Sequence, residues 1–178
     1  MGKRSNFPKK DKDFYGTVDK KVLKDSFLGY IKGKTYAEPC YGHGDLEGLL
    51  LPYAQLRFKC DIRATNVACK VQDALATTKE QVKDCDIIIT NPPFSRDVLL
   101  PMIDHFISLK PTWLLLPADY MHNQYFKPYM EKCSRVVSIG RICWFPTDEG
   151  KRVASTDNFC WYFWQKGATS DTYTVFET

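Results

Sequence analysis

Two continuous apolar segments, residues 87–90 and 113–116, constrain the fold more than any other feature of the chain. Neither alternates apolar with polar residues, so both fit strands of a parallel sheet that is covered on its two faces. Residues 98–109 lie between them and have the length of a helix that connects two parallel strands. We therefore expect an α/β protein with a doubly wound, mostly parallel sheet.

Shorter patterns before and after this unit predict the remaining elements. The apolar spacing over residues 18–31 fits one face of a helix, and residues 36–40 and 56–60 are typical of strands. Residues 141–145 and 159–164 are late apolar runs without a helix-length segment between them, which favours antiparallel pairing. The predicted sheet therefore carries an antiparallel edge hairpin.

Composition and cysteine usage bound the class of protein. A chain of 178 residues with 44% apolar residues can bury a core and is typical of one domain. We expect residues 1–12 to form a basic flexible tail, with a phosphate-binding arm as the alternative, and residues 13–178 to form a single domain. The seven cysteines are an odd number without a Cys-x-x-Cys spacing, which argues against a zinc site and against secreted disulfides. We expect no metal, no membrane span and a cytoplasmic location.

A glycine-containing turn over residues 37–48 follows the first predicted strand. Gly42 and Gly44 can adopt positive φ and let a ligand approach the backbone, although a tight turn without a ligand is the alternative. Asp61 ends the second predicted strand, where a carboxylate can accept hydrogen bonds from both hydroxyls of a ribose. Asp73 is a candidate partner for an adenine amino group. Together these residues predict a cofactor that contains a nucleoside.

The segment 87–90 leads directly into Asn91-Pro92-Pro93-Phe94. The two prolines hold the backbone extended and donate no hydrogen bonds, which leaves the Asn91 side-chain oxygen and the Pro92 carbonyl as two fixed acceptors. Two such acceptors can bind both hydrogens of a planar amino group, and Phe94 offers a flat surface for an aromatic base. The tetrapeptide therefore predicts a site that binds a planar amine.

With these residues, the chain resembles the class I S-adenosylmethionine-dependent methyltransferases that methylate amino groups, and in particular the small phage-type DNA adenine N6-methyltransferases. The resemblance extends over residues 13–165 and rests mainly on the NPPF tetrapeptide. It implies that Asn91 and Pro92 hold the target amine, that Phe94 stacks on the target base, and that Pro93 completes the catalytic tetrapeptide. It also implies a class I, Rossmann-like methyltransferase fold.

Other segments of the chain resemble the cofactor motifs of this group. Residues 13–17 resemble its amino-terminal motif, residues 38–44 its methionine-binding loop, Asp61 its ribose-binding acid and Asp73 its adenine-side acid. The cofactor-binding residues that the resemblance implies are Phe14, Tyr15, Thr17, Glu38, Pro39, Cys40, Gly42, Gly44, Asp61, Ile62, Asp73 and Ala74. The implied cofactor is S-adenosyl-L-methionine.

The implied activity is methyl transfer to the N6 amino group of adenine, first of all in DNA. Adenine in RNA is the alternative, because the tetrapeptide contacts only the base, and methylation of a protein glutamine ranks third, because such relatives usually carry tyrosine in place of Phe94. A nucleic-acid-binding subunit without catalysis would not need an intact NPPF. A dehydrogenase would leave residues 91–94 without a role.

The chain departs from restriction-type relatives because no segment after Phe94 is large enough for a separate target-recognition domain. The long loop 144–159 carries Lys151 and Arg152, which are the predicted nucleic-acid contacts, with a solvated hairpin loop as the alternative. A homodimer would supply a second reading surface. The resemblance to phage proteins implies an enzyme that acts in the cytoplasm of the host.

Overall fold

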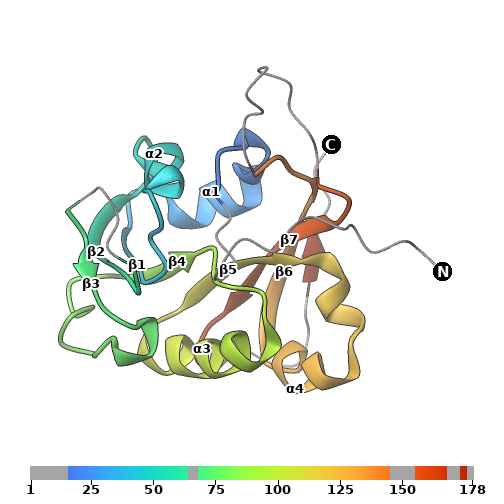
Figure 1. Cartoon of the computed structure of the whole chain (residues 1–178). Helices are drawn as coiled ribbons and strands as arrows, with labels where there is room; N and C mark the ends of the chain where they lie inside the picture. The colour runs from blue at the N-terminus through green and yellow to red at the C-terminus, as the bar shows by residue number, and fades with distance from the viewer. Residues whose placement is uncertain (1–15, 64–67, 145–154, 168–172, 176–178) are drawn as a thin grey trace.

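The computed structural model describes residues 16–63, 68–144, 155–167 and 173–175. In this part of the chain, eight strands form one sheet in the order β3-β2-β1-β4-β5-β7-β6-β8 (Figure 1). The strands are β1 (Thr35–Glu38), β2 (Gln55–Asp61), β3 (Lys70–Val71), β4 (Ile87–Thr90), β5 (Thr112–Pro117), β6 (Cys133–Arg141), β7 (Asn158–Trp164) and β8 (Tyr173–Val175). The α-helices are α1 (Asp25–Ile31), α2 (Asp45–Leu50), α3 (Arg96–Leu109) and α4 (Lys127–Met130), and the 3₁₀ helices are η1 (Lys20–Val22), η2 (Ala74–Ala76), η3 (Ala118–His122) and η4 (Gln124–Phe126).

The strand order confirms the predicted doubly wound, mostly parallel sheet. Strands β3, β2, β1, β4 and β5 are parallel, whereas β7 runs antiparallel to both of its neighbours, β5 and β6. The chain builds outward from β1 to β2 and β3 and then returns to β4 on the other side of β1. The carboxyl ends of β1 and β4 therefore lie side by side at the point where the strand order reverses, which is where open α/β sheets form their ligand crevice.

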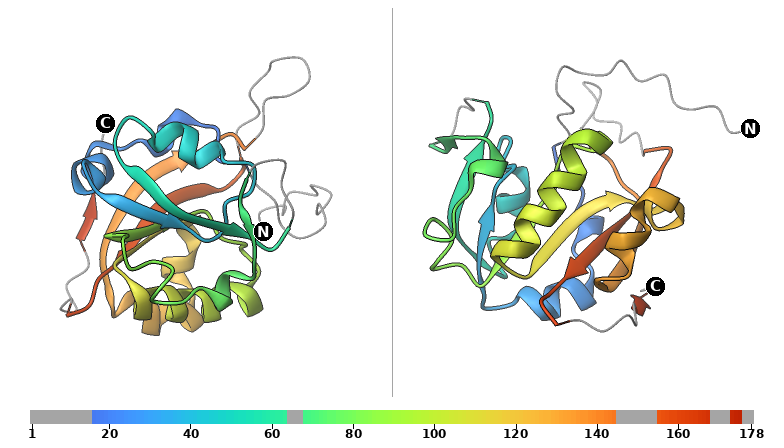
Figure 2. Two further views of the ribbon diagram at one scale, coloured as in Figure 1. Left: turned by 90° about the vertical axis from the view of Figure 1, so that its left-hand side faces the viewer. Right: turned by 90° about the horizontal axis from the view of Figure 1, so that it is seen from below.

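Two hydrophobic cores cover the two faces of the sheet. One core contains residues of α1 and α2, and the other contains residues of α3 and η4. Figure 1 shows α1 and α2 on one side of the sheet and α3 and α4 on the other, and the view from below in Figure 2 shows α3 alongside β5. In β4, Ile87 and Ile89 point into the first core and Ile88 into the second. The continuous apolar runs thus correspond to strands that are buried on both faces.

The predicted helix over residues 18–31 is interrupted in the structure. It consists of η1 and α1, separated at Lys24, whose φ of −81° and ψ of 142° are extended. Asp19 begins η1 by accepting a hydrogen bond from the Lys21 amide, and the Val22 carbonyl accepts one from the Trp161 indole. The apolar spacing that suggested one helix therefore comes from two short helices. The Val22 carbonyl near their junction binds the Trp161 indole instead of continuing one helix.

The predicted strand over residues 141–145 is wrong in its position. The strand that pairs with β7 is β6, which ends at Arg141. Gly140 has a φ of 87° and lies at a register shift in the β6–β7 pair, and the Cys143 amide donates to the Asp19 carboxylate at 2.9 Å. The chain leaves the sheet after Arg141, and the Cys143 amide binds Asp19 instead of a strand partner.

Three further findings concern membrane spans, cysteines and metal sites. No helix in the described ranges is long and apolar enough to cross a membrane. All seven cysteines lie in described segments and are free thiols. Within those segments, no group of three or more His, Cys, Asp or Glu residues could hold a metal ion.

Candidate active site

A cavity of about 290 Å³ opens at the carboxyl ends of β1, β2 and β4. Its volume is just below the range for small-molecule sites, which is roughly 300–1,000 Å³. The predicted residues that line it are Thr17, Glu38, Pro39, Cys40, Gly42, Asp61, Ile62, Asp73, Ala74, Asn91 and Pro93. The cavity thus brings together residues from both predicted groups, the cofactor loop and the tetrapeptide.

Some predicted residues lie elsewhere. Gly44, Pro92 and Phe94 do not line the cavity but belong to the same loops as residues that do. Phe14, Tyr15, Lys151 and Arg152 lie outside the described residues. The lining residues that the sequence analysis did not select are Gly16, Tyr41, His43, Asp45, Leu46, Arg63, Ser95, Val98 and Met102. Each of these lies either next to a predicted residue in the sequence or on the helix that follows one.

The loop after β1 has the backbone conformation that its glycines predict. Gly42 and Gly44 have φ angles of 57° and 87°. A Cβ atom at Gly44 would overlap the hydroxyl oxygen of Tyr41, so a larger residue would displace that ring. Gly44 also precedes the first residue of α2. The tight turn therefore places the beginning of α2 next to the cavity.

Asp61 holds this loop against the end of β2. Its Oδ2 accepts a hydrogen bond from the Gly42 amide at 2.8 Å, and its Oδ1 accepts one from the Arg63 amide at 3.0 Å. Each carboxylate oxygen can accept two hydrogen bonds, so both oxygens keep capacity for a ligand in the cavity. Asp61 therefore has a structural function that the sequence analysis did not anticipate, in addition to its predicted ribose contact.

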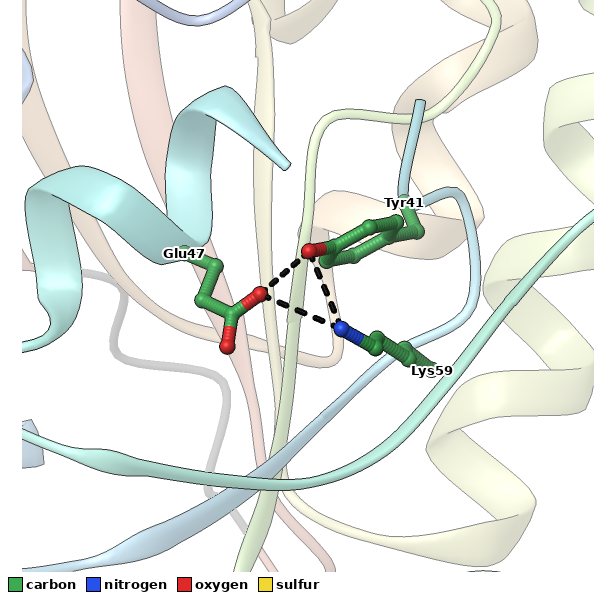
Figure 3. A network of polar contacts seen from close by, with 3 residues as sticks. All are labelled: Tyr41, Glu47 and Lys59. Atoms are coloured by element: carbon green, nitrogen blue, oxygen red, sulfur yellow. Dashed lines mark hydrogen bonds and ion pairs between the residues drawn. The ribbon is translucent and has the colours of Figure 1, made fainter. Parts of the chain in front are cut away.

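A second polar network, formed by Tyr41, Glu47 and Lys59, also holds the loop after β1 in place (Figure 3). The Tyr41 hydroxyl donates to the Glu47 carboxylate, and the Lys59 ammonium lies 3.2 Å from the Tyr41 oxygen and 3.5 Å from Glu47 Oε2. Tyr41 comes from the loop, Glu47 from α2 and Lys59 from β2, so the network ties three elements together. Burial raises the pKa of Tyr41, which keeps its hydroxyl protonated as a donor.

Glu38 is a buried carboxyl group at the end of β1. It is 1% exposed, lines the cavity, and receives no hydrogen bond at Oε2 from any described residue. Burial, followed by the negative charge of Glu47 and to a smaller extent of Asp45 and Asp61, raises its pKa well above the ordinary value of 4.5, whereas Lys59 lowers it. A buried carboxyl oxygen without a hydrogen-bond partner is costly, and a cationic group in the cavity would compensate it.

The raised pKa of Glu38 predicts how stability depends on pH. The native state retains the Glu38 proton to higher pH than the unfolded state, so this residue makes the free energy of unfolding fall as pH rises above about 4.5, until Glu38 ionises in the native state. The slope is at most about 1.4 kcal/mol per pH unit for one proton. We expect Glu38→Gln to remove this component in denaturant titrations across pH. Parallel pH profiles for the variant and the wild type would contradict the assignment.

Asn91 directly follows β4 and lies beside the amino-terminal segment. Its side-chain nitrogen donates a hydrogen bond to Thr17 Oγ1 at 3.1 Å, and Thr17 is 4% exposed. This bond fixes the rotation of the amide, so its oxygen lies on the side away from Thr17. The Cys40 amide donates to Thr90 Oγ1 at 3.3 Å and joins the ends of β1 and β4. The position of Asn91 relative to the glycine loop is therefore fixed.

Phe94 is partly buried against two other aromatic residues. Its ring centroid lies 6.0 Å from that of Trp144 and 5.7 Å from that of Phe159. Its carbonyl oxygen accepts a hydrogen bond from the Tyr120 hydroxyl at 2.6 Å. Tyr120 belongs to η3, directly after β5, and nothing in the sequence distinguished it from other tyrosines. It fixes the backbone of the tetrapeptide at its last residue.

Comparisons with known proteins give a result at the level of the fold. No protein-family model matches the sequence, and no curated protein matches it. Among solved structures, the chain is similar to a Pyrococcus horikoshii protein proposed to be an RNA methyltransferase, with a TM-score of 0.53, 16% identity and 78% of each chain covered. It is also similar to a dimethyladenosine transferase from Plasmodium falciparum, with a TM-score of 0.50, 17% identity and coverage of 82% of this chain and 59% of that one.

A third similar structure is the M protein of the type I restriction enzyme EcoKI, with a TM-score of 0.56, 9% identity and 88% of this chain covered. The chain spans 47% of that protein. At these identities the similarity concerns the fold alone. The strand order and these similarities show that the chain has the class I, Rossmann-like methyltransferase fold.

Proposed function

We propose that the protein transfers the methyl group of S-adenosylmethionine to the N6 amino group of adenine in DNA. The observation that carries the proposal is that one cavity is lined both by Asn91 and by the carboxyl side chains of Glu38 and Asp61. The acceptor end and the cofactor end of a methyl transfer must meet in one site, because the reaction is an in-line displacement. In the known fold, this is the crevice at the carboxyl ends of the parallel strands.

The residues around the cavity fit the proposed cofactor. The buried carboxyl group of Glu38 offers a partner for the ammonium group, Asp61 has acceptor capacity for the ribose, and Asp73 also lines the cavity and is the proposed partner for the adenine. The positive φ at Gly42 brings backbone to the cavity without a side chain in between. The lining carboxylates outnumber the lining Arg63 side chain, which favours a ligand with positive groups.

The protein's own residues prepare the amine for the transfer. The cofactor, when bound, supplies a methyl group that is already activated. Asn91 and the Pro92 carbonyl accept hydrogen bonds from the two amine hydrogens, which favours a geometry in which the nitrogen lone pair leaves conjugation with the ring. Thr17 holds the Asn91 amide in place. Phe94 is not part of the cavity lining but lies between the lining residue Ser95 and the tetrapeptide prolines, and it is the proposed stacking surface for the base. Preorganised acceptors of this kind reduce the barrier without a strong base.

Adenine in RNA is the second candidate substrate. Two of the similar structures carry names that refer to RNA or to dimethyladenosine, although the similarity itself concerns the fold. The discriminating experiment incubates the protein with donor labelled in the methyl group and, separately, with single-stranded DNA, duplex DNA, RNA and protein. Label in N6-methyladenine from DNA supports the proposal. Label only in RNA would move the assignment to the second candidate, and no label in either nucleic acid would contradict both.

Tyr120 gives a milder test of the tetrapeptide. The Tyr120→Phe variant loses one hydrogen bond to the Phe94 carbonyl but keeps the ring that packs against Phe126. A hydrogen bond of this kind is worth about 0.5–1.5 kcal/mol, so we expect turnover to fall by about two- to tenfold. The Kd for S-adenosylmethionine should stay within a factor of about two, since Tyr120 does not line the cavity. An equal loss in turnover and in cofactor affinity would show a general loosening of the fold.

A further inference from the structure

The described surface beside the tetrapeptide carries a cation that the sequence analysis did not select. Arg96 is the first residue of α3, two positions after Phe94, and its side chain is exposed. The guanidinium carbon lies 4.5 Å from the centroid of the Tyr125 ring. A guanidinium at this distance from a tyrosine ring is held by a cation–π interaction. Arg96 is therefore a positioned cation rather than a freely moving one.

A series of contacts fixes this cation relative to Phe94. The Tyr120 hydroxyl binds the Phe94 carbonyl, and the rings of Tyr120 and Tyr125 lie 6.4 Å apart in an edge-on arrangement. Asn123 donates to the Tyr125 hydroxyl at 3.3 Å, and Tyr125 also contacts the fully buried Phe126. The tetrapeptide and Arg96 are thus joined both along the chain and through η3 and η4.

Packing alone does not account for an arginine at this position. The ion pairs in the described part of the chain do not involve Arg96. A cation in the first turn of a helix opposes the helix dipole, which the neighbouring Asp97 offsets only in part. A neutral side chain would cover Tyr125 without this cost. The N–H groups at the edge of a stacked guanidinium remain available and match the geometry of a phosphate.

We propose that Arg96, held on Tyr125, binds a phosphodiester of the nucleic-acid strand next to the adenine that enters the site. This inference rests on the proposed function and adds the surface by which the strand is held. DNA and RNA share the phosphodiester, so the contact serves either substrate. A phosphate contact positions the strand without reading its bases. Base preference is therefore expected to depend on other residues.

The test measures the binding of single-stranded oligonucleotides by fluorescence anisotropy at several salt concentrations. One DNA and one RNA probe, each with a single adenine, are compared for the wild type, Arg96→Ala, Arg96→Lys and Tyr125→Leu. Loss of one phosphate contact on a single strand should reduce the slope of log affinity against log salt by about 0.7. We expect this reduction and a roughly tenfold weaker affinity in Arg96→Ala. Arg96→Lys should keep the slope, because it keeps the charge.

Lys166→Ala is the matched control for the loss of one exposed positive charge. Lys166 lies after the end of β7, and Trp164 at that end pairs with Thr112 at the start of β5. Lys166 therefore lies near the amino-terminal ends of the parallel strands, whereas the cavity lies at their carboxyl ends. The control should bind both probes like the wild type, and calorimetry should give all variants the wild-type Kd for S-adenosylmethionine. Tyr125→Leu should weaken binding at an unchanged slope, because the charge remains but is no longer held.

Three outcomes would overturn the inference. An unchanged salt slope in Arg96→Ala would show that Arg96 does not contact a phosphate. An equal loss of affinity in Lys166→Ala would show that the effect of Arg96→Ala comes only from the change in net charge. Failure of the wild type to bind either probe, with or without S-adenosylmethionine, would contradict the nucleic-acid substrate itself. Only the last result also refutes the proposed function, so the two failures are distinguishable.

Discussion

Replacing Asn91 with alanine should lower the rate of methyl transfer by roughly 100-fold or more while the Kd for S-adenosylmethionine changes little. The side-chain oxygen is one of two acceptors proposed for the target amine, and loss of one preorganised group of this kind costs on the order of 100-fold in rate. The amide is held by its hydrogen bond to Thr17 Oγ1, so its orientation is set before the substrate enters. Single-turnover rates with labelled donor, together with calorimetry of cofactor binding, measure the two quantities separately.

Thr17→Val is the matched control for Asn91. It keeps the shape of the side chain but removes the oxygen that accepts from the Asn91 amide. The acceptor is then present but less well oriented, so its rate should fall between those of the wild type and Asn91→Ala. If Asn91→Ala turns over within a few-fold of the wild type, Asn91 does not bind the amine. If Thr17→Val is slower than Asn91→Ala, the amino-terminal segment has another function in the site.

The central part of the fold could be predicted because its signal is local. The residues of β4 are buried on both faces, so every position in the strand is apolar or β-branched, and no helical period competes with this pattern. Strands β3 and β8 have only two and three residues, which is too short for any periodicity. The position of β6 depends on Gly140 and on the bond between Asp19 and the Cys143 amide. That bond joins residues 124 positions apart, so no window of sequence contains it.

The distinction between local sequence signals and contacts between distant residues also applies to the site. Glycines and acids that follow strands are visible in the sequence, because parallel strands bring their carboxyl ends to one edge of the sheet. Contacts that fix those residues are not visible. The Tyr120 hydroxyl meets Phe94 only because η3 follows β5 beside the tetrapeptide, and Trp144 meets Phe94 only through the end of β6. The sequence thus indicates which residues lie at the carboxyl ends of the strands, and most of them line the cavity, whereas the residues that orient them required the structure.

Asp61→Ala should weaken the binding of S-adenosylmethionine by roughly 100-fold or more. The carboxylate is the proposed acceptor for the ribose hydroxyls, and hydrogen bonds to a charged group are worth about 1.5–3 kcal/mol each. The same carboxylate holds the Gly42 and Arg63 amides at 2.8 and 3.0 Å. The variant therefore loses ligand contacts and the anchor of the glycine loop together. Calorimetry on a variant that retains its cooperative unfolding transition measures the combined loss.

A cofactor analogue separates the two functions of Asp61. S-adenosylhomocysteine and its 2′-deoxyribose analogue are titrated against the wild type and Asp61→Ala, and the four affinities form a double-mutant cycle. If Asp61 binds the ribose, removal of the hydroxyl weakens binding to the wild type but hardly affects the variant, which has already lost that contact. If the analogue loses the same affinity with both proteins, Asp61 acts on the loop alone, through Gly42. Unchanged affinity of a folded Asp61→Ala for S-adenosylmethionine would contradict the placement of the cofactor in this cavity.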